Sequence, residues 1–179
     1  MPEIEIRTAT TDDIESLSLF EHSYSSDYVW QMGLEVNEDT AITSFRRTRL
    51  PRRVLVPYPR QKEEIFKDID QVDAFLVAVL EQRPVGYIKV LVEEDSGTVM
   101  ISDLVVSAPM RRQGIASGLI YAAMDFTSFR QYFALMLEVQ SKNDPAICMA
   151  KKLGLKYCGY RDLYFPNREM ALFFSSFLH

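Results

Sequence analysis

The segment Thr98–Ala122 constrains the fold more than any other part of the chain. It combines a β-branched apolar stretch, a short turn with Pro109, a basic pair and a glycine that opens a helix. Gly114 allows the main chain to approach a ligand closely. The free N–H groups of a helix's first turn carry the positive end of the helix dipole and favour an anion. This order predicts an anion site built from backbone, with Arg111 and Arg112 adding positive charge beside it.

The apolar stretches around this segment predict its neighbours in a sheet. Three of them, at 74–80, 85–92 and 99–106, are joined by short turns and predict an antiparallel meander. A helix from Gln113 to about Phe129 leads to a strand at 132–139, which should lie parallel to 99–106 because a helical crossover joins them. The other expected elements are a strand at 4–6, helices near 11–20, 62–70 and 143–153, and a closing strand pair at 157–165 and 169–177.

Residues 21–70 are the least regular part of the sequence. Residues 21–35 are expected to form a helix end and a loop, and Val54–Val56 between prolines an edge strand or loop. Residues 41–62 carry seven basic residues and no acidic one. This basic segment forms a solvated face or, alternatively, recognises an acidic group on an acceptor or a partner.

Composition excludes several classes of protein. A chain of 179 residues with 47% hydrophobic content suits one folded domain, and a net charge of −5 argues against nucleic-acid binding. Cys148 and Cys158 cannot form a disulfide framework, and His22 and His179 have no neighbouring ligand set, so no metal is expected. With no signal peptide and no apolar run of about 18 residues, the sequence predicts a cytoplasmic protein that does not bind membranes.

Two motifs carry a family resemblance. The loop Arg111–Ala116 (R-x-x-G-x-A) resembles the R/Q-x-x-G-x-G/A pyrophosphate loop of GNAT-type N-acetyltransferases. Leu137–Gln140 followed by Asn143–Leu155 resembles the second half of that family: a strand end, an Asn-x-x-Ala helix and a Gly exit. The ending over residues 159–174 is similar to the streptothricin-acetyltransferase branch.

The resemblance implies an α/β (α+β) fold: a mixed, mainly antiparallel twisted sheet flanked by helices, with the acetyl-CoA cleft between splayed central strands. The chain 1–179 would form a single acetyltransferase domain, with 21–70 as a variable acceptor-side segment. The backbone near Leu104, Val105 and Val106 would meet the pantetheine arm and the thioester oxygen. The residues expected to bind the cofactor are Leu104, Val105, Val106, Arg111, Arg112, Gln113, Gly114, Ile115, Ala116, Ser117 and Asn143.

Acetyl transfer to an amine also requires a group that accepts a proton, because a primary amine has a pKa of about 10.4. Asp103 and Glu138 are the candidate bases, and we favour Asp103 because its strand is expected to face the thioester. Each could instead be a structural acid or orient the amine by charge. The family often places a tyrosine acid on the second helix, where this chain has Ala150. Tyrosines of the final strands could substitute: Tyr157, Tyr160 or Tyr164.

The acceptor pocket is expected to involve the aromatic segment before residue 31 and the end of the strand at 132–139. The candidate residues are Tyr24, Tyr28, Trp30 and Gln140, and packing in the core or a loop is the alternative role of the aromatic ones. The expected activity is direct acetyl transfer from acetyl-CoA to a primary amine of a small molecule or protein. A catalytically impaired CoA-binding sensor or partner-binding module is the main alternative, and a nucleotide-phosphate-binding protein is another. A homodimer could form along an exposed strand edge at 171–177.

Overall fold

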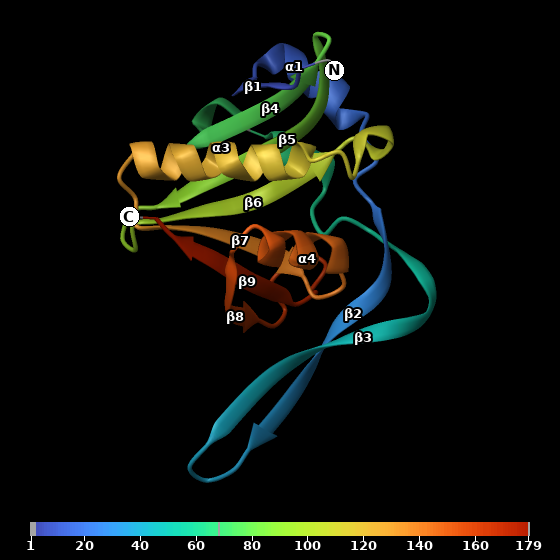
Figure 1. Cartoon of the computed structure of the whole chain (residues 1–179), viewed down its shortest axis with the longest axis vertical. Coiled ribbons are helices and arrows are strands. Elements are labelled where there is room, and N and C mark those ends of the chain that lie inside the picture. The colour runs from blue at the N-terminus through green and yellow to red at the C-terminus, as the bar shows by residue number, and fades with distance from the viewer. Residues whose placement is uncertain (1–2, 68, 179) are drawn as a thin grey trace.

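One mixed sheet organises the molecule (Figure 1). The computed structural model describes residues 3–67 and 69–178, and across these residues seven strands form a sheet of order β1-β4-β5-β6-β7-β9-β8. Neighbouring strands are antiparallel except for the parallel pair β6–β7. The strands are β1 (Glu5–Thr8), β4 (Ala74–Leu80), β5 (Arg83–Glu93), β6 (Thr98–Val106), β7 (Ala134–Gln140), β8 (Lys156–Arg161) and β9 (Ala171–Phe177). The predicted fold class, meander and parallel crossover are confirmed.

Helices cover both faces of this sheet. The α-helices are α1 (Thr11–Ser18), α2 (Lys62–Phe66), α3 (Ile115–Phe129) and α4 (Asp144–Lys152). One apolar core lies between the sheet and the pair α3 and α4, and includes Leu119, Ile120 and Ile147, all 0% exposed. A second core lies on the other face and includes Leu17 of α1 and Ile65 of α2. Short 3₁₀ turns lie at Ile69–Gln71 and Ala108–Met110. Within the described residues, no helix is both long enough and apolar enough to cross a membrane.

A long hairpin replaces the helix end and loop expected at 21–35, so that prediction was wrong. Strand β2 (Tyr24–Val36) pairs antiparallel with β3 (Ala41–Val56), and the hairpin projects away from the sheet (Figure 1). The sequence does contain the relevant period, because apolar side chains occupy every second position from residue 28 to 36. Pro51 is accommodated because residues 50–53 form an irregularity opposite Asp27.

The order of the last two strands corrects a second prediction. Strand β9 lies between β7 and β8, so the edge expected at 171–177 is not an edge of the sheet. Leu172 and Phe174 are 0% and 2% exposed. Strand β9 pairs with both β7 and β8, whereas β8 pairs with β9 alone. Strand β8 therefore forms this edge of the sheet. The dimer contact predicted along an edge at 171–177 is therefore ruled out. His179, considered above as a metal ligand, lies outside the described residues.

Candidate functional site

The parallel strands β6 and β7 separate along their length. Residues 98–101 of β6 pair with residues 134–137 of β7, whereas the two strands continue to Val106 and Gln140. The β6–β7 separation thus begins in the middle of the sheet and opens toward the start of α3. The splayed central strands implied by the family resemblance are present in the structure.

The β6 backbone alternates in the direction of its polar groups along this separation. The N–H of Ser107 donates to the carbonyl of Val85 on β5, at 2.9 Å. Because successive residues of a strand direct their N–H and C=O groups to opposite edges, Leu104 and Val106 direct theirs toward β7. The backbone of Val105 faces β5 instead, so its expected contact with a thioester oxygen is not supported by this register.

The loop before α3 has the conformation that the glycine predicted. Gly114 has φ of 85°, and Arg112 before it has φ of 64°. No atom lies within 4 Å of a Cβ built at Gly114, so backbone conformation rather than space requires glycine there. Ile115 is 5% exposed and anchors the first turn to the core. The helix begins at Ile115, so its first N–H groups lack helical partners. The residues that present backbone here are Arg112, Gln113, Gly114, Ile115, Ala116 and Ser117.

The side chain of Arg111 has a role that the sequence did not predict. Its guanidinium donates to the carbonyl oxygens of Val106 (3.0 Å), Ser23 (2.9 Å) and Glu21 (2.5 Å). Burial lowers the pKa of this group. Arg111 therefore fastens the segment that enters β2 to the end of β6, next to the anion loop.

Arg111→Ala is expected to lower the free energy of unfolding by about 2–3 kcal/mol. The three backbone carbonyls that Arg111 contacts would lose a charged donor, and a hydrogen bond to a charged group is worth about 1.5–3 kcal/mol. Arg112→Ala is the matched control, since Arg112 is exposed. Its unfolding free energy should stay within about 0.5 kcal/mol of the parent. Denaturant titrations of both variants measure the difference, and equal stabilities would contradict the structural role of Arg111.

Asn143 caps the second helix of the motif. Its Oδ1 accepts a hydrogen bond from the N–H of Ala146 at 3.1 Å, and Pro145 occupies an early helical position. Asn143 thus caps α4 through its side-chain oxygen, and its Nδ2 group remains able to donate to another partner. Ala150 of α4, at the place of the family's usual tyrosine, is 0% exposed and packs in the apolar core on the α3 and α4 face of the sheet.

The two candidate bases meet at one arginine. Arg60 Nη2 pairs with Glu138 Oε1, and Arg60 Nη1 lies 3.6 Å from Asp103 Oδ1. Arg60 Nη1 also donates to the carbonyl of Ser102 at 2.8 Å. The side chains of Asp103 and Glu138 are each 1% exposed, against 20% for Arg60. The structure therefore brings Asp103 and Glu138 into one buried ionic cluster on the face of α1 and α2.

Each carboxylate of this cluster also binds a tyrosine. Tyr58 Oη donates to Asp103 at 2.9 Å, and Tyr164 Oη donates to Glu138. Burial raises the pKa of Glu138, while Arg60 and the Tyr164 hydrogen bond oppose that shift. Burial raises the pKa of both Tyr58 and Tyr164. A raised carboxyl pKa beside hydrogen-bond donors is an arrangement suited to proton transfer.

The ionic cluster opens onto a hollow of about 450 Å³. Its charged lining consists of four acidic and two basic side chains: Glu64, Glu93, Asp103, Glu138, Arg60 and Lys89. The excess of carboxylates favours a cationic ligand at this face of the sheet.

Tyr157 lies on the other face. It pairs with Phe174, which pairs with Leu137, and residues directly opposite one another share a face. Glu138 follows Leu137, so it projects to the opposite side. The structure does not bring Tyr157 together with the candidate bases. The tyrosine of the final segment that reaches them is Tyr164.

The residues expected at the acceptor site, Tyr24, Tyr28, Trp30 and Gln140, take part in contacts that join the β2–β3 hairpin to the rest of the molecule. Tyr24 Oη donates to Gln140 Oε1 at 2.7 Å, and Gln140 Nε2 donates to Glu169. Trp30 Nε1 donates to Asp144 Oδ1 at 3.0 Å. The structure thus joins Tyr24 to Gln140 at the start of β2, and Trp30 to α4.

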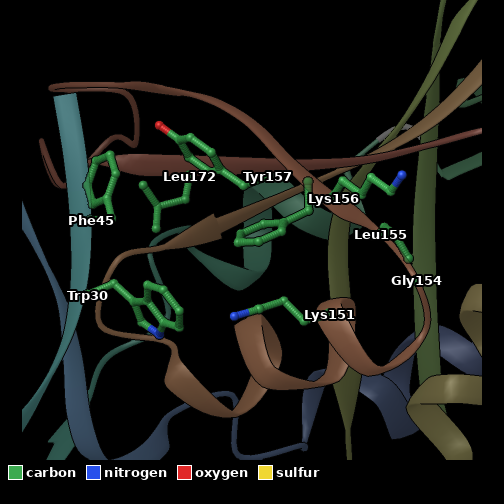
Figure 2. A pocket seen from close by; sticks show the side chains of 9 residues that line it. Trp30, Phe45, Lys151, Gly154, Leu155, Lys156, Tyr157 and Leu172 are labelled. Atoms are coloured by element: carbon green, nitrogen blue, oxygen red, sulfur yellow. The ribbon is translucent and has the colours of Figure 1, made fainter. Parts of the chain in front are cut away.

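Tyr28 belongs to the same contact between the hairpin and α4. Arg47 forms a two-bond ion pair with Asp144, at 2.7 and 2.8 Å, and its guanidinium lies 3.6 Å from the centre of the Tyr28 ring. A pocket opens beside Trp30, on the Tyr157 face of the sheet (Figure 2). Figure 2 shows the Lys151 side chain extending toward Trp30 from α4. The aromatic residues thus stand apart from the ionic cluster.

Sequence reasoning missed Arg60 and Tyr58. Both lie just after β3, where prolines and a basic run indicated a loop. Arg60 was expected to be solvated or to meet an acid outside the chain, whereas it pairs with this chain's own Glu138 and Asp103. The available signal was the burial of two carboxylates on adjacent strands, which requires a compensating cation.

Comparisons with known proteins agree with this geometry. Streptothricin acetyltransferase A of Bacillus subtilis (strain 168) is 28% identical over 100 residues, which span 54% of this chain and 57% of that protein. N-acetylaspartate synthetase of Rattus norvegicus is 29% identical over 99 residues, 55% of this chain and 33% of that protein. The matched region thus spans about a third to somewhat over half of these relatives.

Solved structures share the fold over nearly the whole chain. Nourseothricin acetyltransferase superposes with a TM-score of 0.81 at 21% identity, covering 97% of this chain and 98% of that one. A proposed streptothricin acetyltransferase from Bacillus anthracis, solved with acetyl coenzyme A, gives 0.76 at 17% identity, covering 98% and 100%. The family model of the acetyltransferase (GNAT) family matches residues 40–155. On this match the chain belongs to the acetyltransferase (GNAT) family.

Proposed function

We propose that the protein is an N-acetyltransferase that transfers the acetyl group of acetyl-CoA to a primary amine by direct attack. The observation that carries this proposal is the ionic cluster of Glu138 and Asp103 beside the β6–β7 separation, which leads to the start of α3. We extend it to the chain 1–179 as one acetyltransferase domain, with residues 21–70 on the acceptor side.

The residues around the β6–β7 separation fit acetyl-CoA. The N–H groups of residues 112–117 and the positive dipole end of α3 suit a pyrophosphate. The edge amides of Leu104 and Val106 suit a pantetheine arm, and Asn143 Nδ2 suits a hydrogen bond to the same arm. When bound, acetyl-CoA supplies an acetyl thioester. An edge N–H such as that of Leu104 would stabilise negative charge on the thioester oxygen, an effect worth roughly 3–4 kcal/mol in other enzymes.

We assign the base to Glu138 and a positioning role to Asp103. Glu138 lines the hollow and has a raised pKa, so its carboxylate is poised to accept a proton from the incoming ammonium. Asp103 accepts hydrogen bonds from Tyr58 and Ser102 and lies 3.6 Å from Arg60 Nη1, so we assign it the role of positioning that arginine. Asp103 then holds Arg60 in place, and Arg60 keeps Glu138 ionised.

The acceptor is a primary amine of a small molecule or a protein. The acidic excess of the hollow favours an amine that arrives protonated. We place the reaction in the cytoplasm, because Cys148 and Cys158, within the part of the chain that the structure describes, are exposed free thiols, which suits a reducing compartment. We include neither nucleic acid, membrane nor metal in the proposed activity.

Acetyl-CoA is expected to bind at least about tenfold more tightly than ATP, a difference of about 1.4 kcal/mol or more. Calorimetry measures both affinities. Release of free CoA thiol during a screen of primary amines measures turnover. Tight binding without thiol release from any amine would favour the impaired CoA-binding module, and equal competition by ATP would favour a general nucleotide-phosphate site.

A further inference from the structure

The β2–β3 hairpin has two unlike faces. Directly opposed residues share a face, and the register pairs residues 30, 32, 34 and 36 of β2 with 47, 45, 43 and 41 of β3. That face, which we call the apolar face, carries Trp30, Met32, Leu34, Val36, Phe45 and Ala41. The other face carries mainly polar residues, with Ile42 as its exposed apolar side chain near the tip.

The body of the molecule covers the first half of the apolar face. Phe45 lies 5.7 Å from Tyr157 and 5.4 Å from Tyr160 between ring centres, and Lys151 lies 4.9 Å from the Trp30 ring. Leu34 and Val36, farther along the same face, are 55% and 67% exposed. Figure 1 shows this outer half projecting beyond the sheet. A two-stranded hairpin without a second layer is marginally stable in water, so the exposed half needs a cover.

The tip and the pocket beside Trp30 are complementary. The tip carries exposed acidic residues, Glu35, Glu38 and Asp39, next to Leu34 and Val36. The pocket is lined by apolar side chains together with two lysines, Lys151 and Lys156 (Figure 2). An acidic, apolar tip therefore matches a basic, apolar pocket on the same chain.

The tip cannot fold back into its own pocket. It lies about six residues beyond Trp30 along a paired strand, a rise of roughly 20 Å. We propose that the occupant is a second copy of the chain: two copies pair about a twofold axis, and each hairpin tip covers the pocket of its partner. A twofold contact uses the same two surfaces twice, so it buries both exposed halves of the apolar face. This proposal stands independently of the enzymatic activity.

Sedimentation and light scattering test the hydrophobic part of the contact. The full chain is expected to have twice its monomer mass of 20.7 kDa. Leu34→Arg together with Val36→Arg is expected to raise the dimer dissociation constant by at least about a hundredfold. Ile42→Arg, at the same distance along the hairpin but on the other face, is the matched control and should remain dimeric. A monomeric parent, or a dimer that survives the double change, would overturn the proposal.

Charge reversal tests the partner surfaces. Glu38→Lys with Asp39→Lys makes the tip basic, and Lys151→Glu with Lys156→Glu makes the pocket acidic. Each double variant alone should lose dimer, because like charges then face each other. A mixture of the two should form a heterodimer, since both of its tip–pocket contacts join opposite charges. Failure of the mixture to associate would overturn the pairing of tip with pocket, whereas recovery of the dimer mass supports it.

Discussion

Glu138→Gln is expected to lower kcat by about 10²- to 10⁴-fold, the usual contribution of a positioned general base. Glutamine keeps the shape of the side chain and can still meet Arg60 and Tyr164, but it cannot accept the proton of the amine. Steady-state rates of CoA thiol release measure the loss. Acetyl-CoA affinity, measured in parallel by calorimetry, is expected to stay unchanged, because the carboxylate lies at the acceptor side.

The pH profile separates the base from its neighbours. Burial raises the pKa of Glu138, so activity should fall as pH drops through a value above the usual carboxyl range. Tyr164→Phe removes a hydrogen bond that favours the ionised carboxylate, and should move this fall in activity to higher pH. Asp103→Asn should keep the same fall in activity at low pH, with a smaller loss of kcat than Glu138→Gln. A larger loss in Asp103→Asn than in Glu138→Gln would transfer the role of base to Asp103.

Arg60→Ala is expected to lower the free energy of unfolding by about 3–5 kcal/mol near neutral pH. The change leaves Asp103 and Glu138 close together, buried and without their cation. Denaturant unfolding measures the difference. Arg46→Ala removes an exposed arginine of the same basic segment and should stay within about 0.5 kcal/mol of the parent.

The loss of unfolding free energy caused by Arg60→Ala should depend on pH in a defined direction. Burial raises the pKa of Glu138 and Arg60 opposes that shift, so without the cation the folded-state pKa of Glu138 should lie further above its unfolded value. Its unfavourable effect on stability is then absent below the unfolded pKa and appears as pH rises through the folded pKa. The deficit should therefore shrink in acid. Arg60→Lys keeps a charge and should recover part of the stability. A deficit that is constant with pH would show that lost packing, rather than lost charge, is responsible.

Local rules along the chain were sufficient for the central part of the fold. The continuous apolar stretch 74–80 and the turns that follow it specify the meander, because a buried strand needs apolar side chains on both faces. The crossover from β6 through α3 to β7 leaves one favoured arrangement, the parallel pair. Gly114 marks the anion loop because its positive φ is one that other residues rarely adopt.

Long-range contacts decided the rest, and no local pattern reports them. Arg60 follows a proline-rich segment, and its role depends on strands that lie 42 and more residues farther along the chain. Tyr157 and Tyr164 are equally plausible in sequence, but the register of β8 against β9 places Tyr157 on the face opposite Glu138.

The sequence by itself determined the sheet, its crossover and the loop that begins α3, because each depends on residue period, turn chemistry or backbone conformation within a few neighbours. Only the tertiary structure decided which cation compensates the buried acids, which tyrosine joins them and where the hairpin projects. Those outcomes depend on burial and charge shared between distant segments, since a buried charge is tolerated only where the fold brings it a partner.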